Sequence, residues 1–148
     1  MNLPWQRKPG YEAKGRVLVP FSGALDARVL EAAIRITRAE QATLVAAYLL
    51  VVPLQYPEDA ALKEQVARAL PVLEAVEQTA LRARVPVDAR IEKGRSLTHA
   101  LARLWEVERF DRIVAPAPGF TAKELAWILT HAPAETVVLR PGPVASAA

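Results

Sequence analysis

The sequence predicts a single α/β domain built on a doubly wound, five-stranded parallel sheet with the strand order 3-2-1-4-5. Apolar stretches of strand length alternate with stretches whose apolar residues recur at helical spacing, which is typical of parallel sheets with right-handed helical crossovers. Residues 42–52 are apolar almost throughout, as expected of a strand covered by helices on both faces. A length of 148 residues and an apolar content of 52% suit one compact core of the Rossmann-like type.

The first half of the chain supplies two strands and two helices. Residues 16–20 (RVLVP) form the first predicted strand, and residues 25–36 carry apolar side chains at helical spacing. Residues 42–52 follow as the second strand. Pro57 is expected to open the second helix, since a missing N–H costs nothing there, and Pro71 is expected to kink that helix without ending it. The predicted apolar stripe of this helix consists of Leu62, Val66, Leu70, Leu73 and Val76.

The second half supplies three strands and two helices. Residues 85–92 (VPVDARIE) alternate in polarity and contain Pro86, which indicates an edge strand. Ser96 can cap the helix that follows it, and residues 111–115 form the fourth strand. Thr121 and Glu124 make the T-x-x-E capping box of the last helix. The fifth strand begins at Ala134 and ends at Leu139.

The charge distribution separates a basic arm from a neutral body. The net charge is +3, and the first 16 residues account for all of it, because the remainder carries 15 basic and 15 acidic side chains. We therefore expect a basic, flexible arm over residues 1–15, the α/β domain over residues 16–141 and a tail over residues 142–148. Contact of the arm with an anionic partner is the alternative. A neutral body argues against nucleic-acid binding.

Composition also narrows the compartment and the chemistry. The chain has no cysteine, which excludes disulfides, a thiol nucleophile and a zinc ribbon, and is compatible with the reducing cytoplasm that we expect. No apolar run reaches the roughly 18 residues of a membrane helix, so no membrane insertion is predicted. The first residues lack the apolar core of a secretory signal.

The predicted strand order places a candidate cleft at the carboxyl ends of the first and fourth strands. Ligands of doubly wound sheets bind at this switch point. Residues 20–23 and 116–119 should face each other there. The candidate cleft residues are Pro20, Phe21, Ser22, Gly23, Leu49, Pro116, Gly119 and Thr121.

Three segments together resemble the universal stress protein family. Residues 16–37 (RVLVPFSGALDARVLEAAIRIT) resemble its opening strand and helix, residues 91–119 its third strand, glycine turn, helix and D-x-I-V strand, and residues 131–141 its closing segment. The resemblance covers about residues 16–141. It implies a small α/β protein that usually dimerises, and many members of this family bind ATP.

The positions that hold ATP in the family differ in this chain. The resemblance places the family's acidic residue at Ser22, the first glycine of its phosphate loop at Pro116 and the second at Gly119, and its later G-S pair has no counterpart. Proline has no N–H for a phosphate oxygen, and a serine hydroxyl lacks the charge and second oxygen of a carboxylate. We therefore predict a binding or regulatory protein with a degenerate nucleotide site and no cofactor. An ATP- or AMP-binding protein with an altered loop is the alternative.

Catalytic signatures are weak. Ser96 precedes His99 by three positions, but no orienting carboxylate stands at a recognisable spacing, and a helix cap beside an ordinary histidine explains the pair. His131 falls in the last turn of a predicted helix, where positive charge is favourable. No metal-binding or Walker motif occurs. A small nucleotide hydrolase is therefore the least favoured hypothesis, and we expect no enzyme.

The last strand predicts a homodimer. Val137, Val138 and Leu139 are consecutive and apolar, and the strand should lie at a sheet edge without a protecting charge. Pairing with the same strand of a second copy would satisfy its backbone, and the family's usual dimer supports this by resemblance. An unidentified protein partner is the other interaction that we consider.

Overall fold

The computed structural model describes residues 9–141 and contains five strands and four helices in strict alternation. The strands are β1 (Gly15–Phe21), β2 (Ala42–Val51), β3 (Val87–Gly94), β4 (Arg112–Pro116) and β5 (Glu135–Leu139). The helices are α1 (Ala27–Ala39), α2 (Lys63–Arg82), α3 (Leu97–Val107) and α4 (Ala122–His131). The predicted tail and the first eight residues of the predicted arm lie outside the described residues.

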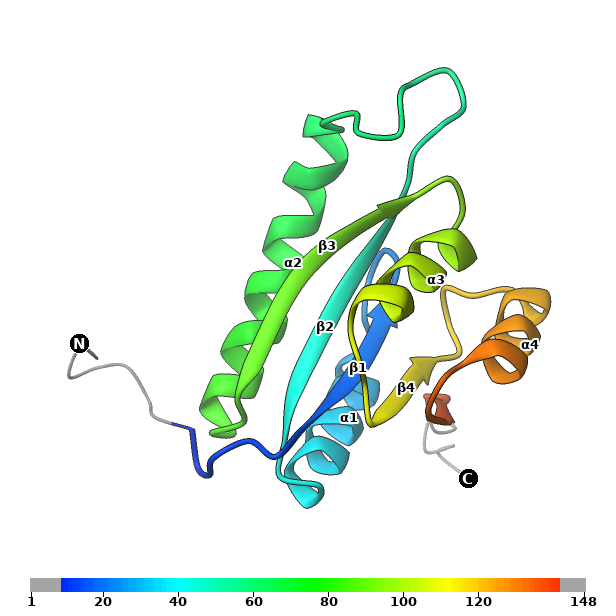
Figure 1. Cartoon of the computed structure of the whole chain (residues 1–148). Helices are drawn as coiled ribbons and strands as arrows, with labels where there is room; N and C mark the ends of the chain where they lie inside the picture. Colours follow the sequence, from blue (N-terminus) through cyan, green and yellow to red (C-terminus); the bar gives the residue numbers. More distant parts are fainter. Residues whose placement is uncertain (1–8, 142–148) are drawn as a thin grey trace, which may run out of the picture.

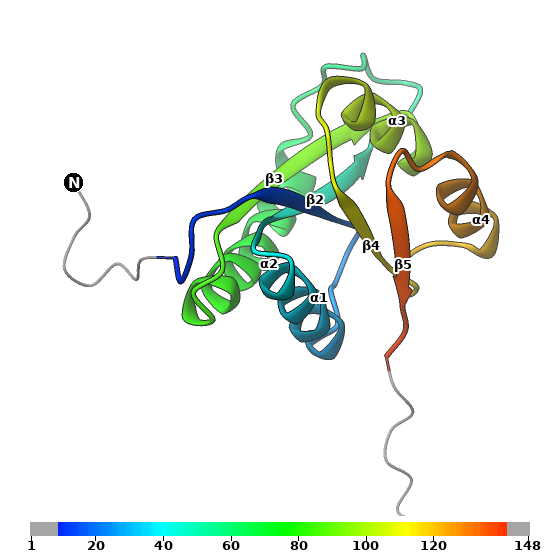
Figure 2. The same cartoon turned by 60° about the horizontal axis from the view of Figure 1, so that its bottom comes forward.

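The five strands form one parallel sheet in the order β3-β2-β1-β4-β5, which confirms the predicted fold class and strand order. α1 and α2 cover one face of this sheet, and α3 and α4 cover the other (Figures 1 and 2). β1 and β4 are neighbours, so their carboxyl ends meet at the switch point of the strand order. β3 and β5 are the two edges, as the sequence predicts.

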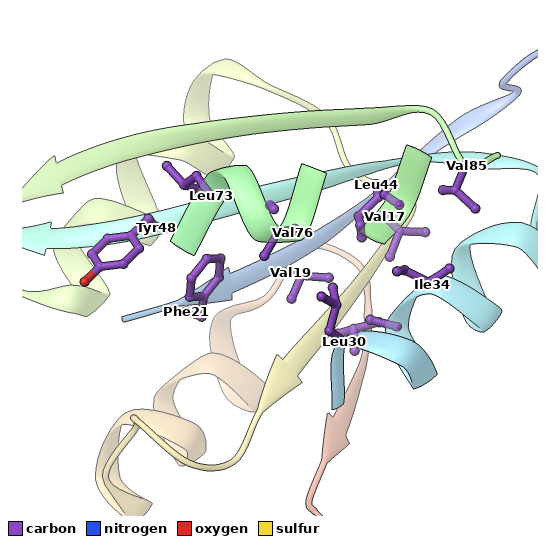
Figure 3. Close-up of a cluster of buried hydrophobic side chains, with 14 of the residues drawn as sticks. Val17, Val19, Phe21, Leu30, Ile34, Leu44, Tyr48, Leu73, Val76 and Val85 are labelled. Atoms are coloured by element: carbon purple, nitrogen blue, oxygen red, sulfur yellow. The ribbon is translucent and has the colours of Figure 1, made fainter. Parts of the chain in front are cut away.

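Each face of the sheet has its own core because alternate residues of a strand point to opposite sides. Val17, Val19 and Phe21 pack with Tyr48 beneath α1 and α2, and this cluster is drawn in Figure 3. The phenyl ring of Phe21 meets the ring of Tyr48 edge to face, with centroids 5.3 Å apart. Leu18 belongs to the second cluster, beneath α3 and α4. Residues 42–50 of β2 are almost entirely buried, as the unbroken apolar run predicts.

Helix α2 differs from the prediction in its start and in one residue of its stripe. It begins at Lys63, not at Pro57, and its N-cap residue Leu62 adopts a left-handed conformation without a side-chain cap. Leu70 is 53% exposed, so its place in the stripe was wrong. Ala69, Leu73, Val76 and Ala80 form the buried face instead. The helix is continuous through Pro71, and the kink stays a prediction.

Glycine sets the distance between α3 and the sheet. A Cβ atom built on Gly94, the last residue of β3, would lie 2.6 Å from the backbone nitrogen of Ala100 in α3. No side chain fits in that gap, so helix and strand approach closely here. Ser96 caps α3 as predicted, because its hydroxyl accepts a hydrogen bond from the N–H of His99.

The second half of the predicted arm lies against the amino ends of the strands. The N–H of Gly10 donates to the carbonyl of Arg84, just before β3. The hydroxyl of Tyr11 donates to the carbonyl of Ala42 at 2.8 Å. Burial raises the pKa of the Tyr11 hydroxyl, and the positive charge of Arg38 opposes that rise. Residues 10–11 are therefore attached to the domain.

Candidate functional site

The candidate cleft lies where β1 and β4 end side by side. Ser22 follows β1, and Gly119 belongs to the turn after β4. The two turns touch, because a Cβ atom on Gly119 would lie 3.2 Å from the carbonyl oxygen of Ser22. Gly119 has a φ angle of +97° and Gly23 one of +77°, conformations that favour glycine. The structure thus brings Ser22 and Gly119 together.

The other candidate residues divide between the core and the surface. Phe21 and Leu49 are buried in the clusters on opposite faces of the sheet, so they support the cleft from within. Pro20 and Pro116 are also buried. Gly23, Gly119 and Thr121 are exposed and Ser22 is half-buried. A ligand at this point would therefore meet mainly Ser22, the two glycines and the start of α4.

The backbone donors of residues 116–121 are mostly engaged within the protein. Pro116 and Pro118 have no N–H to offer. The N–H of Ala117 donates to the carbonyl of Leu139 at 2.7 Å, and the N–H of Phe120 donates to the carbonyl of Ala117 at 3.4 Å. Within the described part of the chain, only the N–H of Gly119 in this turn donates to no protein acceptor.

The start of α4 uses the N–H groups of Thr121 and Glu124 in the predicted capping box. The hydroxyl of Thr121 accepts from the N–H of Glu124 at 3.0 Å, and the carboxylate of Glu124 accepts from the N–H of Thr121 at 2.8 Å. A helix N-terminus attracts anions, but here a carboxylate already neutralises part of that attraction. The turn therefore offers few donors for a phosphate group.

The edge formed by β5 is apolar and only partly covered. Thr136, Val137, Val138 and Leu139 are all half-buried, and Glu135 is the one charged residue of the strand. Leu139 packs against the cluster beneath α1 and α2. The position of β5 at a sheet edge is confirmed, and the dimer remains a proposal.

The sequence reasoning missed a cluster of ion pairs on the face of β3 that points toward α3. The guanidinium of Arg90 forms ion pairs with Asp88, Glu92 and Glu108, and Arg16 of β1 reaches Glu108 at 2.8 Å. The alternation of Asp88, Arg90 and Glu92 in the sequence signals such a face. Glu108 lies after α3, and no local pattern connects it to β3.

Opposite pKa shifts distinguish two carboxylates of this cluster. Burial raises the pKa of Glu108, but hydrogen bonds from Arg90 and Arg16 more than offset burial and hold it below the usual range. Burial raises the pKa of Glu92, and the nearby charge of Arg90 offsets this only in part. The cluster stabilises the ionised form of one acid and disfavours that of the other.

A second feature without a sequence signal is the contact of two cations, one in β3 and one just after it, with the connection between β2 and α2. Arg95, just after β3, donates to the carbonyls of Pro53 and Tyr56, both at 2.7 Å. Lys93 donates to the carbonyl of Ala60 at 2.8 Å. These contacts hold residues 53–60 along a defined path beside the sheet. Leu54 points outward and is 87% exposed.

The contacts of the two histidines are those of a helix cap and of aromatic packing. His99 is exposed and its backbone receives the Ser96 cap. The imidazole of His131 stacks on the indole of Trp127 at a centroid distance of 4.8 Å, and Trp127 stacks on Trp105 at 5.4 Å. The two indoles join α3 to α4 on the outer side of the second core. The hydroxyl of Ser96 lies 3.1 Å from that of Thr98, an arrangement that suits a helix cap.

Within residues 9–141, no three His, Asp or Glu side chains are grouped so as to hold a metal ion. No helix within the same residues has the length and apolarity needed to cross a bilayer.

Comparison with solved structures finds the same fold in universal stress proteins. The protein UspA from Lactobacillus plantarum superposes with a TM-score of 0.71 at 20% identity, over 87% of this chain and 99% of that one. A universal stress protein described in complex with cAMP gives a TM-score of 0.65 at 18% identity, over 86% and 98% of the two chains. A member from Arabidopsis thaliana described with AMP bound gives 0.64 at 18% identity, over 85% and 91%.

Sequence comparison alone finds less. No protein-family model and no curated protein matches the chain. Identities of 18–20% establish architecture but not ligands. This chain covers each of these three neighbours almost from end to end, so the whole domain has their architecture. The shared architecture confirms the resemblance seen in the sequence. The chain therefore has the fold of the universal stress proteins.

Proposed function

We propose that this protein is a dimeric binding or regulatory module that does not hold ATP in the manner of a phosphate loop. The engagement of the backbone donors in residues 116–121 carries this proposal. A phosphate cradle needs several N–H groups aimed at oxygen atoms. Here two positions are proline, and three N–H groups already donate within the protein, so an entering phosphate would have to break these hydrogen bonds first.

The side chains at the cleft support the same proposal. Ser22 presents one hydroxyl where a carboxylate could bind two ribose hydroxyls at once. Glu124 places negative charge in the first turn of α4, and the positive charge of Lys123 beside it offsets this charge, so the start of the helix has no net charge to attract a triphosphate. Neither the turn after β1 nor the turn after β4 supplies a cation within residues 20–23 or 116–121. We expect no catalytic turnover at this cleft, and the cytoplasm is the compartment that we propose.

Calorimetric titration with magnesium and ATP tests the proposal. We expect no saturation at millimolar nucleotide, equivalent to a binding free energy weaker than about −4 kcal/mol. Pro116→Gly with Pro118→Gly would restore two N–H groups, and measurable binding by that variant alone would support the account. A low-micromolar dissociation constant for the unaltered chain would refute it.

Binding of a nucleoside monophosphate is the second candidate. Two structural neighbours are described with AMP or cAMP, and a monophosphate needs fewer donors than a triphosphate. The N–H of Gly119 and the hydroxyl of Ser22 would be the hydrogen-bond donors for the phosphate group. Separate titrations with AMP and cAMP test this, and Ser22→Ala should weaken any binding that depends on the hydroxyl. Saturation below about 100 μM would favour this candidate over the first.

The proposed dimer is built on β5. Its exposed edge has unpaired backbone groups and consecutive apolar side chains, so antiparallel pairing with β5 of a second copy would satisfy both. The twofold axis of such a pair makes the contact self-complementary and closes the assembly at two copies. Sedimentation at micromolar concentration should show a dimer, and a monomer under those conditions would refute this part of the proposal.

A further inference from the structure

A depression lies at the amino end of β5, far from the candidate cleft. It has a volume of about 530 Å³ and lies between the end of α3, the turn into β4 and the residues just before β5. Pro133 and Ala134 form its wall on the β5 side. Val107, which is 76% exposed, supplies apolar surface beside it. The depression is therefore accessible to a molecule that packs beside the first residues of β5.

Acidic side chains predominate around this depression. Glu106, Glu108 and Asp111 line it, against the single base Arg109. Glu108 is already paired with Arg16 and Arg90, and the carboxylate of Asp111 accepts from the N–H of Arg16. Glu106 is exposed, and it forms no ion pair with any described residue. Glu106 is therefore the carboxylate of the depression that is best placed to pair with an additional cation.

Arg140 is an exposed cation at the opposite end of the same strand. It directly follows Leu139 and makes no ion pair with the residues that the structure describes. Leu139, the last residue of β5, packs against the cluster beneath α1 and α2. Continuing the alternation of the strand by one residue directs Arg140 to the face that carries α3 and α4. The depression lies on that same face, since α3 forms one of its sides. Figure 2 shows α3 and α4 beside β4 and β5.

Antiparallel pairing of β5 with its copy brings these two features together. Full overlap of the five-residue strand sets Val137 opposite Val137 of the second copy, and therefore Ala134 opposite Arg140 of the second copy. The strands then lie about 4.8 Å apart. The twofold axis of an antiparallel pair is perpendicular to the sheet, so it preserves faces, and both copies present α3 and α4 on the same side.

We propose that the depression at the amino end of β5 receives Arg140 of a second copy of this chain, with Glu106 as its main acceptor. This inference rests on the proposed β5 dimer and adds a specific polar contact to it. The aliphatic stem of Arg140 lies over Pro133 and Val107, and the guanidinium reaches the carboxylate. Each dimer contains the contact twice.

Charge reversal tests the contact directly. Arg140→Glu should raise the dimer dissociation constant about tenfold, because two repulsive pairs replace two partly exposed ion pairs. Arg35→Glu is the matched control, since it changes the net charge equally on an exposed part of α1. Glu106→Arg should weaken the dimer as Arg140→Glu does, and the two changes together should restore affinity to within about threefold. The measurement is sedimentation equilibrium at low and high salt, with circular dichroism confirming that each variant is folded.

The outcomes separate this inference from the dimer proposal. If Arg140→Glu and Arg35→Glu have the same dimer dissociation constant, the proposed contact is wrong. If Val138→Lys still weakens the dimer in that case, the β5 dimer itself stands. Failure of Glu106→Arg to restore the affinity of Arg140→Glu would also overturn it. A monomeric unaltered chain would overturn both proposals. Three results would together support the inference. Each single charge reversal should weaken the dimer, this weakening should disappear at high salt, and the double variant should regain the affinity of the unaltered chain.

Discussion

The two edge strands of the sheet differ in polarity: β3 is rich in charged residues, and β5 is mostly apolar. β3 has eight residues and carries Asp88, Arg90, Glu92 and Lys93, and three of these join ion pairs on one face. β5 has five residues, of which only Glu135 is charged, and its last three are apolar. Charged residues discourage a second strand from pairing with an edge. The comparison teaches that this fold protects one edge by its sequence and leaves the other suited to a partner.

The largest expected effect comes from placing the same charge on each edge. Val138→Lys on β5 should raise the dimer dissociation constant about 100-fold, because the ammonium group would be buried without a partner. Val87→Lys on β3 is the matched change, since Val87 is also a half-buried strand valine, and it should leave association unaltered. Sedimentation of both variants checks this, and equal weakening by the two would mean that the edges do not differ.

The second test concerns the helix that covers β3. Gly94→Ala should destabilise the protein by about 2 kcal/mol or more, since the new methyl group would overlap the backbone of Ala100 in α3. Gly23→Ala is the control, because its Cβ would meet no atom within 4 Å and only the positive φ angle opposes it. The control should lose about 1 kcal/mol. Urea unfolding measures both, and the reverse order would contradict the close approach of α3 to β3.

The third test uses pH to separate the two carboxylates on the β3 face. The pKa of Glu108 is lowered in the folded protein, so its ionised form stabilises the fold above the ordinary glutamate pKa, and this is lost as pH falls through the folded pKa. Glu108→Gln should therefore lower stability at pH 7 by about 1 kcal/mol, with the difference disappearing below about pH 4.

Glu92 should show the opposite sign. Its pKa is raised, so stability is greatest below the ordinary glutamate pKa and falls as pH rises through the folded pKa. Glu92→Gln should then be slightly more stable than the unaltered protein at pH 7, and equal to it below about pH 4. Thermal unfolding between pH 4 and pH 7 provides the readout. Destabilisation by Glu92→Gln at pH 7 would show that its pairing with Arg90 outweighs burial.

The smallest effect is expected in α2, which packs beside β3. Pro71 is exposed within a continuous helix, so Pro71→Ala should retain the fold and change stability by at most about 1 kcal/mol in either direction. Restoring one backbone hydrogen bond and freeing the unfolded chain act in opposite directions. Loss of the native circular dichroism spectrum would instead mean that the proline fixes the path of α2.

Local patterns predicted most of this fold because most of it is locally determined. The polarity of residues 42–52 indicated a buried strand, and Ser96 and Thr121 marked two helix starts correctly. The start of α2 could not be read in this way. Leu62 provides no side-chain cap, and Lys93 and Arg95 hold the preceding residues from more than 30 positions away.

The candidate cleft was predicted in part for a similar reason. Strand order placed Ser22 beside Gly119, and the structure brings these turns into contact. The donation from Ala117 to Leu139 depends on the register between β4 and β5, which no composition or spacing reveals. The ion pairs of Arg90 with Glu108 likewise depend on how α3 crosses the sheet. Sequence thus located the turns but not the hydrogen bonds within them.

The contact of Arg95 with the connection after β2 has a consequence for how this region can vary in sequence. The acceptors are backbone carbonyls of Pro53 and Tyr56, which every amino acid provides. Side chains at positions 54 and 55 can therefore be exchanged without removing either hydrogen bond. Arg95 itself is not exchangeable in this way, because both hydrogen bonds come from its side chain, through the single guanidinium nitrogen Nη1. A single arginine side chain would thus keep the path of this connection constant while the side chains on its surface change.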